Sequence, residues 1–333
     1  MAVQTQDNLH AFAPSAERVF FLDQRMRSRL ADSLRYILTQ GEGVLTVPHD
    51  RLQKFLTDLE SRPVSPLAFS FYNDVVLAIE EDDVEKASQL LTELTTLPPR
   101  AGGLEIIELA DPKHDAIAAR YARFLNDDPS ISFEIFPPSK QIAEKCRAQI
   151  RDAFALLDAG DPELAGEIRA LLREIVLAAG NKDPKAYTFD GASSFMLWGA
   201  IILNADRGDG AIGMVQMLAH ESAHNLLFGF SADEALVENT PDELFSSPLR
   251  KDPRPMDGIY HATFVTARMH RVVRQLLESG ILDAAAKEKA LKDLAENARL
   301  FKHGIETVQK FARLSPLGTS VMRGASDYMA AAS

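Results

Sequence analysis

The sequence feature that most constrains this chain is a pair of histidines, His220 and His224, in the run HESAH. Both lie in a helical pattern over residues 211–228, and residues four apart on a helix share one face. Two imidazoles at this spacing can reach one metal ion, and Glu221 falls beside them, where it can meet a metal-bound water or a substrate. The spacing therefore favours a metal site on one helix over the alternative, two partly buried histidines with ordinary hydrogen-bond partners.

A catalytic metal site usually has a third protein ligand. The metzincin pattern is excluded, because Leu227 and Phe230 stand where it needs glycine and histidine. Glu238 and Glu243 lie in range for a thermolysin-like carboxylate ligand. His261 is the stronger candidate, because it opens a predicted helix directly after a proline-rich segment, and such a braced segment can return a ligand to the site.

Length and composition limit the function classes. With 333 residues, 46% apolar and 25% charged, the chain can form one large domain or two modest ones. A net charge of −12 repels phosphate backbones, so we expect no nucleic-acid partner. The single Cys146 excludes an internal disulfide framework and suits a reducing cytoplasm. The N-terminus lacks an apolar signal region, and the longest apolar stretch, 195–203, is too short to span a membrane, so we expect a cytoplasmic protein.

Hydrophobic periodicity predicts an α+β fold that is mostly helical, with a small sheet beside the HExxH helix, which would be a zincin-like active-site helix. We expect a helix that Asp161 caps to carry its apolar face as far as Val176. The break at Pro137-Pro138 suggests a boundary. It would separate a helical N-terminal region over 1–136, which can still belong to the same domain, from a metal-binding catalytic domain over 137–333. The other predicted helices are 17–38, 65–79, 83–94, 116–125, 139–158, the segment from after Pro255 to Leu277, and 283–311; the predicted strands are 103–109, 130–136 and 195–203.

Several segments together resemble a known family. These segments are HESAHNLL, VENTP, the block SPLRKDPRPMDGIYHATFV around His261, and the tail ARLSPLG. The pattern resembles HExxH-motif proteins found with ribosomal peptide biosynthesis, also described as α-ketoglutarate-dependent HExxH-type peptide β-hydroxylases. The likeness covers about residues 190–320, and its most specific part is the pairing of HExxH with the later histidine block.

The resemblance implies iron. His220, His224 and His261 would hold Fe(II), with α-ketoglutarate and O₂ as co-substrates, and the reaction would hydroxylate the β-carbon of a residue in a ribosomally made precursor peptide. Three histidines would depart from the usual two-histidine, one-carboxylate oxygenase site. The residues alone leave open a zinc metallopeptidase with Glu221 as general base, and a non-catalytic peptide-binding scaffold.

The far carboxylate of α-ketoglutarate needs a fixed cation, and the planar fork of arginine suits a carboxylate. Arg254 lies seven residues before His261, and Arg268 lies seven residues after it, two helical turns along the same face. We expect one of these two to bind the co-substrate. Arg250 is a third option, but a solvated surface arginine is its simpler interpretation.

Substrate contacts are expected from the strand-rich segment before the HExxH helix. Ser194, Trp198 and Asn204 could contact a peptide that adds as an extra strand. An equally good interpretation of Trp198 is an ordinary core aromatic.

Overall fold

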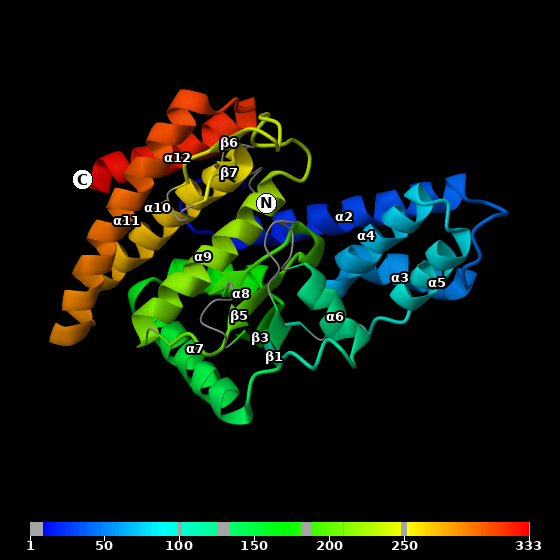
Figure 1. Cartoon of the computed structure of the whole chain (residues 1–333), viewed down its shortest axis with the longest axis horizontal. Coiled ribbons are helices and arrows are strands. Elements are labelled where there is room, and N and C mark those ends of the chain that lie inside the picture. Colours follow the sequence, from blue (N-terminus) through cyan, green and yellow to red (C-terminus); the bar gives the residue numbers. More distant parts are fainter. Residues whose placement is uncertain are drawn as a thin grey trace. The chain divides into compact units, whose positions relative to one another are not determined.

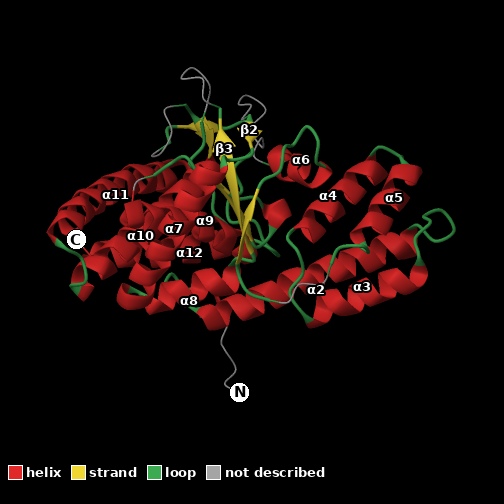
Figure 2. Ribbon diagram, turned by 90° about the horizontal axis from the view of Figure 1, so that it is seen from below, coloured by secondary structure: helices red, strands yellow, loops and turns green. Residues whose placement is uncertain are grey.

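The computed structural model describes residues 9–98, 102–124, 134–181, 188–208, 210–247 and 252–332. The chain is mostly helical with a small sheet, as the α+β prediction requires (Figures 1 and 2). The described elements are α2 (Ala16–Gln40), α3 (His49–Ser61), α4 (Leu67–Glu80), α5 (Val84–Leu94), β1 (Glu105–Glu108), α6 (Ala116–Arg123), β2 (Ile135–Phe136), α7 (Lys140–Gly160), α8 (Pro162–Leu171), β3 (Glu174–Gly180), β4 (Gly191–Ala192), η1 (Phe195–Leu197), β5 (Ala200–Asn204), α9 (Gly210–Phe230), β6 (Leu244–Phe245), β7 (Arg254–Pro255), α10 (Met256–Ser279), α11 (Ala284–Phe311) and α12 (Pro316–Ala332).

The chain divides into two compact units that do not follow a single cut in the sequence. One comprises residues 1–19, 139–169 and 205–333, and the other comprises 20–138 and 170–204. The predicted break at Pro137-Pro138 lies next to one boundary. The units of the structure nevertheless differ from the predicted regions 1–136 and 137–333, because 170–204 packs with the earlier residues. Strand pairing is the reason, since β3 lies between β1 and β5.

The unit that contains 20–138 holds the main sheet. Its strand order is β1-β3-β5-β4, with β1, β3 and β5 parallel, β4 antiparallel to β5, and β2 antiparallel to the end of β3. β3 has the sequence EIVLAAG and is buried along almost its whole length. A parallel strand covered on both faces reads as a continuous apolar run without alternation. Because of that run, the predicted extension of the preceding helix to Val176 is wrong: α8 ends at Leu171 and β3 begins at Glu174.

The unit that contains 205–333 is built around four long helices, α7, α9, α10 and α11. α9 is apolar on nearly all sides, with most of its residues buried, as expected for a helix inside a core. It packs against α7 and α10, and α10 also packs against α11 (Figure 1). The short pair β6–β7 places Arg254 opposite Phe245, directly before α10 begins. α9 runs through Gly229 to Phe230, two residues beyond the predicted end of the helical pattern at residue 228.

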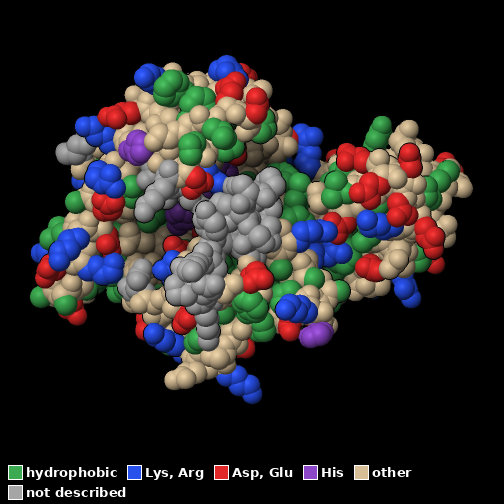
Figure 3. All heavy atoms as spheres, viewed as in Figure 1, with side chains coloured by type: hydrophobic (Ala, Val, Ile, Leu, Met, Phe, Trp, Pro, Cys, Tyr) green, Lys and Arg blue, Asp and Glu red, His purple; other side chains and the backbone are tan. Residues whose placement is uncertain are grey.

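The visible face in Figure 3 carries acidic and basic side chains interspersed, with acidic groups frequent over α4 and α5. In the part of the chain that the structure describes, no helix is both long and apolar enough to cross a lipid bilayer.

Candidate metal centre

The two motif histidines lie on one face of α9, one turn apart, as their spacing predicts. The Nε2 atoms of His220 and His224 are 3.1 Å apart. Two metal bonds of about 2.0–2.1 Å that meet near a right angle span about 3 Å, so this pair can bridge one ion. The rings point toward each other and not to opposite sides of the helix, with centroids 4.8 Å apart.

His261 joins this pair from the second turn of α10. Its Nδ1 atom is 3.0 Å from Nδ1 of His224, and the two rings stack at 5.3 Å. The residue is only 8% exposed. On the other edge of its ring, Nε2 is 4.0 Å from Oδ1 of Asp257, which lies one turn earlier on the same helix. The structure therefore brings together all three histidines of the predicted ligand set.

Burial keeps the three imidazoles neutral near pH 7. It lowers the pKa of His220 to about 4. Burial also lowers the pKa of His224 well below its usual value, and protonation of His220 or His261 would lower it further. The pKa of His261 is lowered by burial and is raised in part by the Asp257 carboxylate. Neutral imidazoles offer the lone pairs that a metal ion needs.

The three neutral imidazoles have the chemistry of metal ligands, but their present orientations do not all point at one ion. Among the described residues, no group of three or more His, Cys, Asp or Glu side chains is positioned to hold an ion. The reason lies in His224, which faces His220 with Nε2 and His261 with Nδ1. The lone pairs of these two atoms diverge, so one ion cannot use both. His220 and His224 fit as they stand, whereas a ligand role for His261 requires its ring to turn relative to His224.

Two residues beside the cluster were not singled out from the sequence. Met269, also on α10, places its sulfur 3.3 Å from Nδ1 of His220 and can accept a weak hydrogen bond there. Asp257 stands at the outer edge of His261, where carboxylates commonly orient a ligating imidazole. The i, i+4 spacing from Asp257 to His261 was a usable signal. No local pattern pairs Met269 with His220.

Glu221 accompanies His220, as the motif predicts. Its Oε1 atom is 3.9 Å from Nε2 of His220, and the residue is 3% exposed. Of the alternative carboxylate ligands, Glu243 accepts hydrogen bonds from Arg313 and Asn239, and Glu238 is exposed. Glu243 is therefore held by other partners, and His261 is the third group beside His220 and His224.

The two predicted co-substrate arginines have different surroundings. Arg268 is 2% exposed, donates to the carbonyl oxygen of Phe12 at 2.7 Å, and forms an ion pair with Glu167. These contacts assign Arg268 to a buried network and argue against the predicted co-substrate role. Arg254 lies in β7 with its side chain partly exposed, 3.3 Å from Asp252. It remains the candidate, and Arg250 lies outside the described residues.

The predicted peptide-contacting residues serve the sheet-containing unit instead. The indole of Trp198 donates to Asp23 at 3.1 Å, and the amide of Asn204 donates to the carbonyl oxygen of Phe189 at 2.9 Å. The hydroxyl of Ser194 accepts from the backbone of Met196. β5 has β3 on one side and β4 on the other, so it is not an open edge for an added strand. These observations replace the predicted substrate contacts with local structural roles.

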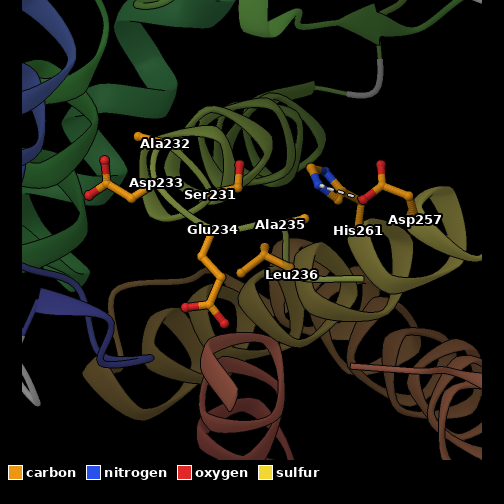
Figure 4. A pocket seen from close by; sticks show the side chains of 8 residues that line it. All are labelled: Ser231, Ala232, Asp233, Glu234, Ala235, Leu236, Asp257 and His261. Carbon is orange, nitrogen blue, oxygen red and sulfur yellow. Dashed lines mark ion pairs between the residues drawn. The ribbon is translucent and has the colours of Figure 1, made fainter. Parts of the chain in front are cut away.

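A pocket of about 340 Å³ opens beside the cluster (Figure 4). It is lined by the segment that follows α9 and by two residues of α10, namely Ser231, Ala232, Asp233, Glu234, Ala235, Leu236, Asp257 and His261. Comparison with models of known protein families and with the sequences of characterised proteins gives no match. The interpretation of this site therefore depends on its own geometry and on the motif resemblance.

Proposed function

We propose that this chain is a metal-dependent enzyme whose ion is bound by His220, His224 and His261. One observation carries the proposal: His261 of α10 lies in ring contact with His224 of α9, which in turn meets His220, although 37 residues separate His261 from His224. Buried imidazoles normally find polar partners of other kinds. Here, three neutral imidazoles gather beside an open pocket, which is the pattern of a ligand set.

Within that class, we propose an Fe(II)- and α-ketoglutarate-dependent dioxygenase that hydroxylates the β-carbon of a residue in a ribosomally made peptide. The support is the resemblance of the HESAH run and the block around His261 to the HExxH peptide β-hydroxylases. When bound, Fe(II) with α-ketoglutarate and O₂ supplies the oxidising chemistry that an unactivated carbon requires. The histidines would hold the ion and leave positions open for the co-substrates.

The protein's own residues would position the co-substrate. Arg254 lies in β7, just before α10. Its Cβ atom is 3.9 Å from the position that a Cβ atom would occupy at Gly258, and Gly258 lies one turn before His261. Its guanidinium can form two parallel hydrogen bonds to the far carboxylate of α-ketoglutarate. Asp257 would orient the His261 ring through the nitrogen that does not face His224.

A specific observation also favours the alternative, a zinc metallopeptidase. Glu221 is buried and lies 3.9 Å from the Nε2 atom of His220 that faces His224. A carboxylate in this place can take a proton from a water molecule that attacks an amide. The same three histidines would serve, so the two functions differ in the metal and in the role of Glu221.

The deciding experiment uses the full chain, purified without oxygen and loaded with Fe(II). Under the oxygenase proposal, α-ketoglutarate produces a weak visible charge-transfer band, and exposure to O₂ with a candidate peptide produces succinate and a peptide heavier by one oxygen atom. His261→Ala should lose the band, and Arg254→Ala should raise the α-ketoglutarate concentration that the band requires by about 10-fold or more.

His114→Ala is the matched control, because His114 is 82% exposed and should leave the band unchanged. Peptide cleavage by the zinc-loaded chain, lost in Glu221→Gln, would select the peptidase instead. Full iron occupancy in His261→Ala would remove His261 from the ligand set.

A further inference from the structure

The segment 313–318, with the sequence RLSPLG, pairs with the chain that follows α9, and we call it the strap. Leu314 forms an antiparallel bridge with Val237. The backbone amide of Glu238 donates to the carbonyl oxygen of Arg313 at 2.7 Å. The residues just before this bridge line the pocket beside the histidine cluster, so the pairing holds one end of a pocket wall.

Gly318 is the residue at which the strap contacts both the pocket wall and the helix that carries the third histidine. A Cβ atom at Gly318 would overlap the carbonyl oxygen of Leu236, which lines the pocket, so only glycine allows this close approach. The carbonyl oxygen of Gly318 in turn accepts a hydrogen bond of 2.8 Å from the hydroxyl of Tyr260. Tyr260 is fully buried and directly precedes His261 on α10. One residue thus joins the wall to the turn of α10 that carries His261.

The local sequence explains why the strap holds this shape. Ser315 caps α12, because its hydroxyl accepts a hydrogen bond of 3.0 Å from the backbone amide of Gly318. Pro316 begins the helix, at a position where an amide proton would have no partner within the helix. The backbone amide of Ser315 donates to the carbonyl oxygen of Leu236 at 3.3 Å. Ser315 therefore fixes both the start of α12 and its distance from the pocket wall.

From these contacts, we propose that the strap is part of the candidate site, and that Tyr260 and Gly318 are positioning residues for His261. The proposal goes beyond the ligand set and rests on the proposed function for the metal. A ligand role for His261 requires its ring to turn, and the turned ring meets the ion only if the backbone beneath it stays in place. The strap supplies this restraint from outside α10, because it ties the turn of His261 to the neighbouring pocket wall.

The first test removes the hydroxyl of Tyr260 from the full chain and measures what His261 still contributes to metal binding. Tyr260→Phe should lower the Zn²⁺ affinity, measured by calorimetric titration, by about 3- to 10-fold. In the His261→Ala background, the same change should cost less than about 2-fold, because Tyr260 acts through His261. A tyrosine that only stabilises the fold would cost the same in both backgrounds, and that result would overturn the proposal.

Tyr328→Phe is the matched control. The hydroxyl of Tyr328 also contacts α10, where it lies 2.9 Å from Nδ1 of His270, away from the histidine cluster. Its removal should leave the Zn²⁺ affinity within about 2-fold of that of the unmodified chain. A loss as large as that in Tyr260→Phe would show that any loosened contact of α10 weakens metal binding, which would also overturn the proposal.

A second measurement needs no metal. Hydrogen exchange at the backbone amide of Glu238, which donates to the strap, should become about 10-fold faster or more in Gly318→Ala. Gly166→Ala on α8 is the control, because its added methyl group would make an ordinary contact of 3.5 Å with Ala16 and should leave this exchange unchanged. Unchanged exchange in Gly318→Ala would overturn the role of Gly318.

The exchange measurement also separates the two proposals. In the metal-free chain, Tyr260→Phe should accelerate exchange at the backbone amide of His261, and an unchanged rate would overturn the role of Tyr260. If the unmodified chain bound no Zn²⁺, the proposed metal centre would be rejected, and the exchange rates at Glu238 and His261 would decide on the strap by themselves. Zn²⁺ binding that is insensitive to Tyr260→Phe would reject the strap alone.

Discussion

Two buried polar clusters lie in the same unit and differ in which groups satisfy their hydrogen-bonding atoms. In the first, Glu167 of α8 forms ion pairs with Arg18 and Arg268, and each arginine also donates to a backbone carbonyl of the N-terminal segment. In the second, the hydrogen-bonding contacts of His224 with the described residues are those with the imidazoles of His220 and His261. Both clusters use α10. In the first, the charges of Glu167 and the two arginines are paired within the chain, whereas the second has the neutral lone pairs and the adjoining pocket of a ligand site.

The comparison teaches that burial and charge alone do not identify function. Arg268 lies in sequence register with His261 and carries the charge that a co-substrate needs, yet its partners make it structural. A useful criterion is whether the donors and acceptors of a cluster match each other. Positive guanidinium and negative carboxylate match, and one backbone carbonyl accepts a further hydrogen bond from each arginine. Three neutral imidazoles match less well, because each offers one donor and one lone pair.

The largest effect should come from breaking the ion-pair cluster. Glu167→Ala would leave two arginines buried without their carboxylate, and removal of one partner from a buried pair costs about 3–5 kcal/mol. Urea unfolding followed by circular dichroism measures this loss. Glu163→Ala, an exposed position on the same helix, should change the unfolding free energy by less than about 0.5 kcal/mol. A loss of under about 1 kcal/mol in Glu167→Ala would mean that the cluster does not stabilise the fold.

In the histidine cluster, we expect a substitution to weaken metal binding strongly and to change the stability of the fold little. His224→Ala removes the ring that contacts both of the others, so we expect the metal affinity to fall by about 100-fold or more, equivalent to about 2.7 kcal/mol. The free energy of unfolding of the metal-free chain should change much less than in Glu167→Ala. Calorimetric titration with Fe(II) or Zn²⁺ measures the affinity. A larger loss of stability than of metal affinity would make the cluster structural.

His270 tests whether a depressed pKa marks function. It also lies on α10, and burial, with a smaller effect of Arg274, lowers its pKa to about 4, yet its Nδ1 has an ordinary partner in the hydroxyl of Tyr328 at 2.9 Å. Between pH 6.5 and about 4 the unfolded chain binds a proton here that the folded chain does not.

This histidine's contribution to stability is therefore full above pH 6.5 and declines as the pH falls, by about 1.4 kcal/mol per pH unit at most. His270→Phe should flatten the pH dependence of unfolding by that amount and leave metal affinity intact. A change in metal affinity would place His270 within the functional cluster.

The sequence predicted well whatever local periodicity controls. The α10 and α11 bounds agree within about two residues, and the HExxH spacing correctly predicted two rings on one face. Prediction from the sequence failed where contacts with residues far away in the sequence determine the structure. β3 was misread because a doubly covered strand and a buried helix are both continuously apolar.

The predicted site residues show the same difference between local and long-range contacts. The structural roles of Arg268 and Trp198 were hidden because their partners, Glu167 and Asp23, are 101 and 175 residues away. The contact of His261 with the motif is also long-range, yet its place after the proline-rich segment and the family resemblance both indicated it. Asp257 had a local signal in its spacing, whereas Met269 had none.

The smallest effect should come from Met269. Its sulfur accepts at Nδ1 of His220 and so favours the tautomer whose Nε2 lone pair faces the site. Met269→Leu keeps the volume and removes the acceptor, so metal affinity should fall by only about 2- to 10-fold, because a thioether is a weak acceptor.

Met322→Leu, a buried methionine on α12, is the matched control for repacking, and each variant should cost less than about 1.5 kcal/mol of stability. Calorimetric titration of the two variants side by side separates these effects. Equal metal affinity in both variants would show that the His220 ring is held by packing alone. A selective loss in Met269→Leu would show that the functional cluster extends beyond its three imidazoles, while the ion-pair cluster needs no such outer support.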